Sequence, residues 1–126
     1  MVMRQCATSL FDLLHNSTAV PAAVARLRPG GAALRPRECT RLLLEAAEGL
    51  AFLHGVGVAH LDVKSMNLML TLEGAVQVAD FGLSRFVDPT GRTPDKSILG
   101  WGSLPWMAPE LIYEEPQSLL KADVFR

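Results

Sequence analysis

The sequence predicts a single domain of the α+β class. Three segments support this prediction. An apolar stripe at helical spacing runs from Arg37 to His54. Two short β-prone runs, 68–71 and 75–79, flank a turn at Glu73-Gly74, and a last helical pattern begins at 119–125. A chain of 126 residues has room for one hydrophobic core.

Composition and charge exclude several classes of protein. The chain is 49% hydrophobic and 20% charged, as in ordinary globular proteins. Its formal net charge of -1 creates no field that would recruit nucleic acid or an anionic membrane. No uncharged apolar run reaches the ~18 residues that span a bilayer, and Arg4 and Gln5 interrupt any export signal. Cys6 and Cys39 have no metal or redox spacing, so we expect a cytoplasmic protein and leave its oligomeric state open.

The first predicted elements are short. Met1-Val2-Met3 is an apolar start that can end a strand. Ser9 can cap a helix whose third residue, Asp12, reaches back toward it, and this helix should end near His15.

Prolines and glycines make the segment 16–37 a loop, although its run Ala22 to Ala25 can form one helical turn. The loop and the helix start after it carry five arginines. They form either a solvated face, which is the usual role of such charges, or a docking patch for an acidic partner. These residues are Arg26, Arg28, Arg35, Arg37 and Arg41.

The segment from Arg37 to His54 has the clearest helical pattern. Pro36 suits its first turn, and Gly55 and Gly57 end it. The stripe predicted to be buried comprises Leu43, Ala46, Ala47, Leu50, Leu53 and His54. Beyond the hairpin, we expect irregular chain until Ala108-Pro109-Glu110.

Three motifs follow one another along the chain. The segment 60–67, with the sequence His-Leu-Asp-Val-Lys-Ser-Met-Asn, lies between the long helix and the hairpin. Asp80-Phe81-Gly82 follows the second strand, and Ala108-Pro109-Glu110 ends the irregular segment. Any one of them alone fits an ordinary turn or strand end, since Asp, Asn and Gly favour loops. In this order and context they indicate a single functional site.

With these motifs the sequence resembles the protein kinase family, whose signatures stand in the same order. Leu61, where the family has arginine, departs from them. The resemblance implies a protein-kinase-like fold, mainly the helix-rich C-terminal lobe, truncated at both ends. It divides the chain into a hinge at 1–8, a catalytic loop at 60–67, an activation segment at 80–110 and the start of a central helix at 119–126.

The resemblance implies transfer of the ATP γ-phosphate to serine or threonine hydroxyls of proteins. Asp62 would orient the hydroxyl and accept its proton, and Lys64 would place a positive charge beside the transferred group. Asn67 and Asp80 would be oxygen ligands for Mg²⁺.

The resemblance also assigns nucleotide and substrate contacts. Met3 would be the gatekeeper, the backbone of Arg4 and Cys6 would meet adenine, and Met69 would form the pocket floor. Ser103, in the substrate-positioning loop, would hydrogen-bond Asp62 and Lys64. Together with Lys64 it is typical of serine/threonine kinases, and the sequence is similar to both the tyrosine-kinase-like group and the Mos kinases.

The remaining assignments concern packing. His60 and Phe81 resemble members of an internal hydrophobic column, and Asp123 resembles the residue that anchors the catalytic-loop backbone. His15 and His54 have no partner pattern, so we expect them to be surface or packing residues.

Two alternatives stay open beside an active enzyme. A Gly-rich loop, a strand lysine and a helix glutamate do not precede Met1, so we expect the isolated 126 residues to be inactive. One alternative is therefore a non-catalytic regulatory or interaction fragment derived from a kinase. The other is a pseudokinase, which the presence of Asp62, Asn67 and Asp80 disfavours.

Leu61 predicts how the enzyme is regulated. In most kinases the arginine at this position pairs with a phosphate on the activation segment. Leucine has no charge or donor, so we expect activity without phosphate on Thr90, Thr93 or Ser97. The alternative is that Arg85 or Arg92 takes over the pairing.

Overall fold

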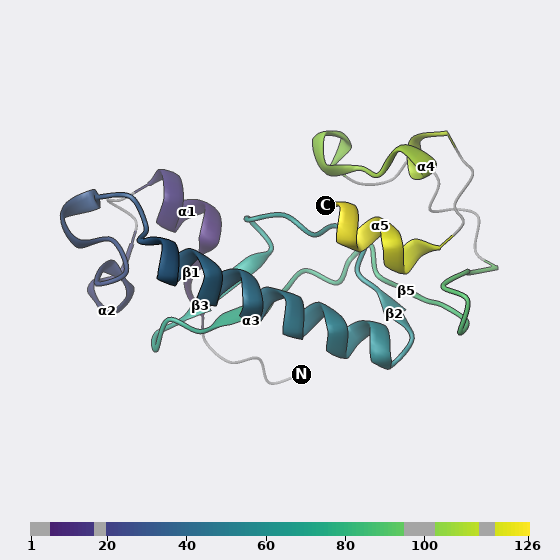
Figure 1. Ribbon diagram of the computed structural model, residues 1–126, viewed down its shortest axis with the longest axis horizontal. Coiled ribbons are helices and arrows are strands. Elements are labelled where there is room, and N and C mark those ends of the chain that lie inside the picture. Colours follow the sequence, from purple (N-terminus) through teal and green to yellow (C-terminus); the bar gives the residue numbers. More distant parts are fainter. Residues whose placement is uncertain (1–5, 17–19, 95–102, 114–117) are drawn as a thin grey trace. The chain divides into compact units, whose positions relative to one another are not determined.

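This computed structural model describes residues 6–16, 20–94, 103–113 and 118–126 (Figure 1). The chain contains both helices and short strands, in agreement with the α+β prediction. The elements are β1 (Cys6–Ser9), α1 (Leu10–His15), α2 (Ala22–Ala25), η2 (Pro29–Gly31), α3 (Pro36–Gly55), β2 (Val58–Ala59), β3 (Leu68–Thr71), β4 (Val76–Val78), β5 (Arg85–Phe86), η4 (Leu104–Trp106), α4 (Pro109–Ile112) and α5 (Leu119–Phe125).

The contacts divide the chain into two compact units. Unit 1 comprises Met1–Gly49 and Ser65–Ala79, and unit 2 comprises Leu50–Lys64 and Asp80–Arg126. Among the described residues, no helix has the length and hydropathy that crossing a membrane requires.

Unit 1 contains a three-stranded antiparallel sheet in the order β1-β3-β4. Strands β3 and β4 form the predicted hairpin, with Leu68 opposite Val78 and Leu70 opposite Val76. Gly74 closes the turn at a φ of +83°, a conformation that glycine adopts without strain. Strand β1 was not predicted, and the strand expected at Met1-Val2-Met3 lies outside the described residues.

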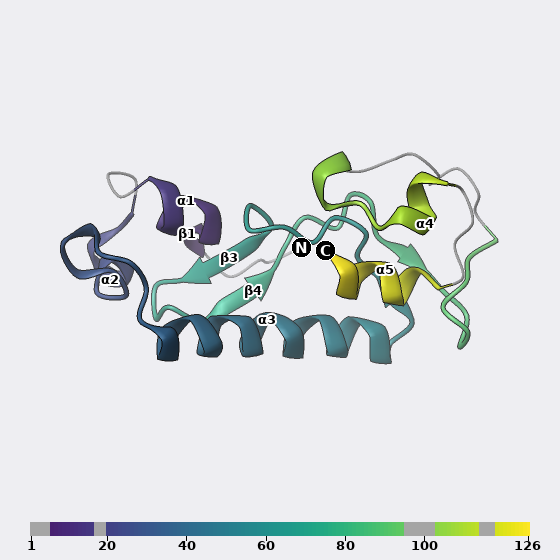
Figure 2. The same ribbon diagram turned by 45° about the horizontal axis from the view of Figure 1, so that its top comes forward.

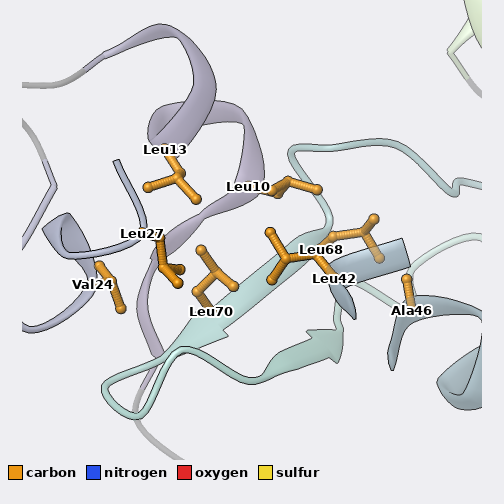
Figure 3. Close-up of a cluster of buried hydrophobic side chains, with 8 residues drawn as sticks. All are labelled: Leu10, Leu13, Val24, Leu27, Leu42, Ala46, Leu68 and Leu70. Carbon is orange, nitrogen blue, oxygen red and sulfur yellow. The ribbon is translucent and has the colours of Figure 1, made fainter. Parts of the chain in front are cut away.

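The apolar core of unit 1 gathers around β3. Figure 3 shows its side chains pointing toward one another from α1, from α2 and the turn after it, and from α3 and β3. Figure 2 shows the first half of α3 beside β3 and β4, where a Cβ on Gly49 would lie 2.9 Å from Val78 Cγ2. Burying one such leucine contributes about 1.5–3 kcal/mol. The buried residues are Leu10, Leu13, Val24, Leu27, Leu42, Ala46, Leu68 and Leu70.

The long helix is confirmed, but the predicted buried stripe is partly wrong. Helix α3 extends one residue beyond the prediction at each end. Leu42 and Ala46 are its buried residues, whereas Leu43 is 64% exposed and Ala47 is also exposed. Because leucine occupies 42–44 without interruption, helical spacing alone could not decide which leucine faces the sheet.

The cap of α1 is confirmed. Ser9 Oγ accepts a hydrogen bond from the Asp12 amide at 3.0 Å and donates one to Asp12 Oδ2 at 2.7 Å. The helix ends at His15, as predicted, and the His15 ring packs on that of Phe11 with 4.7 Å between centroids. Helix α2 is the predicted helical turn.

Three of the five arginines donate hydrogen bonds to backbone carbonyls. Arg26 Nη2 donates to Glu73 O at 2.8 Å, and Arg41 Nη1 donates to Gly74 O at 3.1 Å. Burial alone would lower the pKa of Arg41. Hydrogen bonds to Glu45 and Glu38 outweigh this effect and raise the pKa above its ordinary value. The Arg28 guanidinium donates to the carbonyls of Leu13, Leu14, Gly31 and Ala32. Arg26, Arg35 and Arg37 are exposed, as a solvated face requires, whereas Arg28 and Arg41 are half-buried because the loop carbonyls need donors.

Unit 2 contains two elements that the sequence did not predict. Strands β2 and β5 pair in antiparallel fashion, with Ala59 opposite Arg85, and α4 forms a single turn after Ala108. Both elements are too short to produce a periodic pattern. Helix α5 begins and ends as predicted. A second apolar cluster consists of Ala59, Leu61, Met107, Ala108, Leu111, Leu119 and Ala122.

Candidate active site

A buried carboxylate on α5 holds the segment that precedes Asp62. Asp123, which is 2% exposed, accepts the His60 amide through Oδ2 at 2.7 Å and the Leu61 amide through Oδ1 at 2.7 Å. Leu61 has a φ of +64°, a left-handed conformation that costs a side-chain-bearing residue on the order of 1–3 kcal/mol. The two charge-assisted bonds help to offset that cost. The anchoring contact expected of Asp123 is thus present.

His54 also belongs to this network, which corrects the expectation of a surface or packing role. Its Nε2 lies 2.9 Å from Asp123 Oδ2, and its side chain is only 19% exposed. Because the two residues are 69 positions apart, no local spacing pattern in the sequence indicates their contact. Sequence reasoning could have found it only from the position of His54 at the end of the long helix.

His60 orients the backbone at Asp62 from the buried side. It is fully buried, and its Nδ1 accepts the Asp62 amide at 3.2 Å. Its ring packs against Phe81 with 5.3 Å between centroids. The two rings are in contact, but Phe81 is 49% exposed, so the prediction that it belongs to an internal column is wrong for Phe81. His60 contributes a hydrogen bond that was not foreseen.

Asp62 is one of three side chains that are joined pairwise by hydrogen bonds, a triangle that it forms with Lys64 and Ser103. Lys64 Nζ donates to Asp62 Oδ2 at 2.7 Å and to Ser103 Oγ at 2.8 Å. Ser103 Oγ donates in turn to Asp62 Oδ1 at 3.1 Å. Asp62 is 6% exposed, so donors fix both oxygens of a largely buried carboxylate. The hydrogen bonds predicted for Ser103 are therefore present.

The two expected metal ligands belong to different units. Asp80, in unit 2, is exposed, has a φ of +63° and accepts the Gly82 amide through Oδ1 at 3.3 Å. Asn67, in unit 1, is 7% exposed, and its carbonyl accepts the Ala79 amide at 2.9 Å. No group of three or more His, Cys, Asp or Glu side chains in the described ranges could hold a metal ion. That finding does not concern Asn67, whose side chain is an amide. The pair of Asn67 and Asp80 as metal ligands therefore stays a prediction.

The residues expected around adenine are described only in part. Met3 and Arg4 lie outside the described residues. Cys6 opens β1 and pairs with Thr71 of β3, while Met69 is half-buried within β3. Cys6 and Met69 therefore lie on neighbouring strands of one sheet, and their contact with a nucleotide stays a prediction.

The fold and these contacts define a protein of the kinase class, and comparison with known proteins agrees. The chain belongs to the protein kinase family: the model of the protein kinase domain matches residues 1–126. The family resemblance and the kinase-like α+β fold expected from the motifs are thereby confirmed.

Several curated kinases are similar to the chain. Receptor-like protein kinase HSL1 of Arabidopsis thaliana is 36% identical over 108 residues, which cover 83% of this chain and 10% of that protein. Serine/threonine/tyrosine-protein kinase HT1 of the same plant is 43% identical over 86 residues, 68% of this chain and 20% of that protein. Serine/threonine-protein kinase STE11 of Saccharomyces cerevisiae is 32% identical over 77 residues, 61% of this chain and 11% of that protein. The chain thus spans a fifth or less of each relative's length.

Proposed function

We propose that the protein is an ATP-dependent kinase that phosphorylates serine and threonine hydroxyls of other proteins. The observation that carries this proposal is the triangle of Asp62, Lys64 and Ser103, with its 2.7, 2.8 and 3.1 Å contacts. Membership of the protein kinase family supports it. So does the name of the similar STE11, a serine/threonine-protein kinase, whereas HT1 is named a serine/threonine/tyrosine-protein kinase.

In this proposal Asp62 is the base of the transfer. The substrate hydroxyl oxygen attacks the γ-phosphorus, the bond from that phosphorus to the bridging oxygen of ADP breaks, and the hydroxyl proton passes to Asp62. A base must be held within hydrogen-bond reach of the proton it accepts. The amides of His60 and Leu61 donate to the buried Asp123, and the Asp62 amide donates to the His60 ring. Together with the donors on both carboxylate oxygens, these bonds hold Asp62 in one orientation.

Lys64 supplies positive charge in the same proposal. Phosphoryl transfer depends mainly on positioning and on neutralising the charge of the transferred group. The Lys64 ammonium is 15% exposed and already bridges Asp62 and Ser103, so it can contact a phosphoryl group beside them. The serine at 103 then ties the substrate-positioning loop to the base, which favours serine/threonine substrates.

Asp80 and Asn67 fit magnesium by the chemistry of their donors. Both offer oxygen atoms, which Mg²⁺ prefers, and Asp80 is exposed to solvent. When bound, the ion would neutralise phosphate charge. We assign adenine to Met3, Arg4, Cys6 and Met69, in the hinge at 1–8 and on β3.

The same proposal completes the division of the chain. The catalytic loop is 60–67, the activation segment 80–110 and the start of the central helix 119–126. We place the protein in the cytoplasm, because neither cysteine has the spacing of a disulfide framework.

Mutation of Asp62 in the full-length protein tests the proposal. The purified protein is incubated with Mg²⁺, ATP and a mixed library of serine- and threonine-containing peptides, and phosphate transfer is measured. Asp62→Asn should lower turnover by about 10²–10⁴-fold, the usual range for loss of a general base. Asp88→Asn, which removes an exposed carboxylate of the same unit, should leave turnover within about threefold, in the range of surface substitutions. No transfer by the natural protein, or near-normal transfer by Asp62→Asn, would overturn the proposal.

A further inference from the structure

Arg126 is a buried cation without a hydrogen bond. Its side chain has no exposed surface, and within the described residues none of its Nε, Nη1 and Nη2 atoms has a hydrogen-bond partner. Buried guanidinium groups are nearly always paired, so this one needs an explanation. Burial lowers the pKa of Arg126, and the Asp62 and Asp123 carboxylates oppose that shift. An arginine stays protonated in proteins, so the group is a buried positive charge.

The nearest acceptor for this charge is Asp62. Arg126 Nη1 lies 3.8 Å from Asp62 Oδ1, too far for a hydrogen bond but close enough for an ion pair. Asp123 is the other carboxylate that interacts electrostatically with Arg126. It already accepts hydrogen bonds from two backbone amides and contacts His54. Asp62 is therefore the group whose charge Arg126 balances.

The contacts of Asp62 described above do not supply a second buried charge. Ser103 contacts the carboxylate through a neutral hydroxyl, the His60 ring contacts the Asp62 amide, and Leu61 packs in the apolar cluster with Met107. Lys64 is the second cation, but it is partly exposed, and the proposed function requires it to contact phosphate. When Lys64 turns toward phosphate, the charge of Arg126 stays beside Asp62, because burial keeps it in place.

We propose that Arg126 is a positioning residue: its buried charge keeps Asp62 in the carboxylate form and in a fixed orientation through the transfer step. The inference rests on the proposed function, since both concern Asp62. It assigns a role to the residue that directly follows α5, whose Nη1 lies 3.8 Å from Asp62 Oδ1.

The first experiment compares three variants of the full-length protein. Arg126→Met removes the charge and keeps an apolar stem, Arg126→Lys keeps the charge, and Arg37→Met removes an exposed arginine as a matched control. The pH dependence of kcat and of kcat/KM is measured with Mg²⁺, ATP and the peptide library.

Arg126→Met should lower kcat at least about tenfold, which corresponds to about 1.4 kcal/mol, while the KM for ATP stays within about twofold. A carboxylate that loses a positive neighbour binds its proton more tightly. The acid limb of kcat/KM should therefore move to higher pH by about one unit. Arg126→Lys should restore most of both effects, and Arg37→Met should show neither.

Several results would overturn the proposal. They are an unchanged kcat in Arg126→Met, a lower kcat with an unmoved acid limb, or no recovery in Arg126→Lys. The second of these would identify a role in folding alone. Circular dichroism and the melting temperature establish that each variant is folded, and Arg126→Gln replaces Arg126→Met under the same criteria if the latter does not fold.

A second measurement requires neither activity nor an Arg126 variant. The Nε–Hε NMR resonance of Arg126 is compared between the natural protein and Asp62→Asn. It should shift when the Asp62 charge is removed, and an unshifted resonance would contradict the ion pair. If the natural protein transfers no phosphate, the proposed function fails, and this resonance alone decides whether Arg126 and Asp62 are paired.

Discussion

The two units of this chain are stabilised by different kinds of interaction. Unit 1 encloses a core of branched apolar side chains, with Leu13 and Leu70 at 1% exposure or less. In unit 2 the apolar cluster contains three alanines, and the largest fully buried side chains there include His60 and Asp123. The interior of unit 2 is thus partly a polar network. Its members are fixed by hydrogen-bond geometry, whereas the leucines of unit 1 are fixed by shape.

This difference matters for function because only the polar unit contains the proposed base. An apolar core tolerates exchange of one hydrophobic residue for another of similar volume. A buried carboxylate with three contacts tolerates few substitutions, because every donor that loses its acceptor costs free energy. We therefore expect substitutions in unit 2 to impair activity and stability together, and substitutions in unit 1 to act through stability.

The largest effect on stability should come from Asp123→Ala. The change leaves the His60 and Leu61 amides without their acceptor and removes the contact to His54. Loss of one partner in a buried charged network costs about 3–5 kcal/mol. The free energy of unfolding of the full-length protein and its phosphate transfer are measured. Val124→Ala, at an exposed position on the same helix, serves as control. An unfolding free energy within about 1 kcal/mol of the natural value would contradict the network's importance.

The matching change in unit 1 is Leu70→Ala. Leu70 is fully buried at the centre of β3, so truncation should cost about 2–5 kcal/mol. Hydrogen exchange should increase in the amides of β1, β3 and α1. Leu72→Ala, one position beyond β3 and 47% exposed, should change the unfolding free energy by about 0.5 kcal/mol or less. If both variants lose the same amount, the core described for unit 1 is wrong.

The sequence predicted the elements whose signals are local. The β3–β4 hairpin, the ends of α5 and the Ser9 cap each depend on residues a few positions apart. Pairing of β2 with β5 was missed because it joins two-residue strands that are distant in the chain. The buried face of α3 was shifted because a run of leucines left two registers equally apolar.

Prediction of the site followed the same division. The motif residues Asp62, Lys64 and Ser103 were placed together by family resemblance, and their hydrogen bonds are present. His54 and Arg126 were missed, since a histidine and an arginine have many common roles and nothing in their spacing points to an aspartate. The arginines that hold loop carbonyls were missed for a related reason: a carbonyl acceptor has no sequence signature.

A smaller effect is expected from the activation segment. Leu61 is 4% exposed among apolar side chains, so it offers no charge to a phosphate. Arg85 Nη1 donates to the carbonyls of Leu83 and Ser84. Changing Thr90, Thr93 and Ser97 together to Ala should therefore alter phosphate transfer by less than about fivefold, although Ser97 lies outside the described residues. A loss of about a hundredfold that acidic replacements restore would show that phosphate orders this part of unit 2.

The smallest effect concerns the turn at Asp88, a polar feature of unit 2 that is exposed. Asp88 Oδ1 accepts the Thr90 hydroxyl at 2.6 Å, the Thr90 amide at 2.9 Å and the Arg92 amide at 3.0 Å. The hydrogen bond from the Thr90 side chain is the main cause that lowers the pKa of Asp88 below 3.8, and the Arg92 amide adds to it. A lowered pKa means that the carboxylate stabilises the turn at neutral pH.

That contribution should be complete above pH 3.8 and should disappear as the pH falls below this value through the folded-state pKa. The amide resonances of Thr90 and Arg92 are followed by NMR from pH 6 to pH 2, together with those of Asp88→Asn. In the natural protein both amides should shift with one midpoint below 3.8, and in the variant that shared transition should be absent. The Thr71 amide, which donates to the Ala75 carbonyl in unit 1, provides a reference from the other unit. A shared midpoint above 3.8 would mean that the Thr90 and Arg92 bonds do not favour the charged carboxylate, and that this turn owes its shape to the backbone alone.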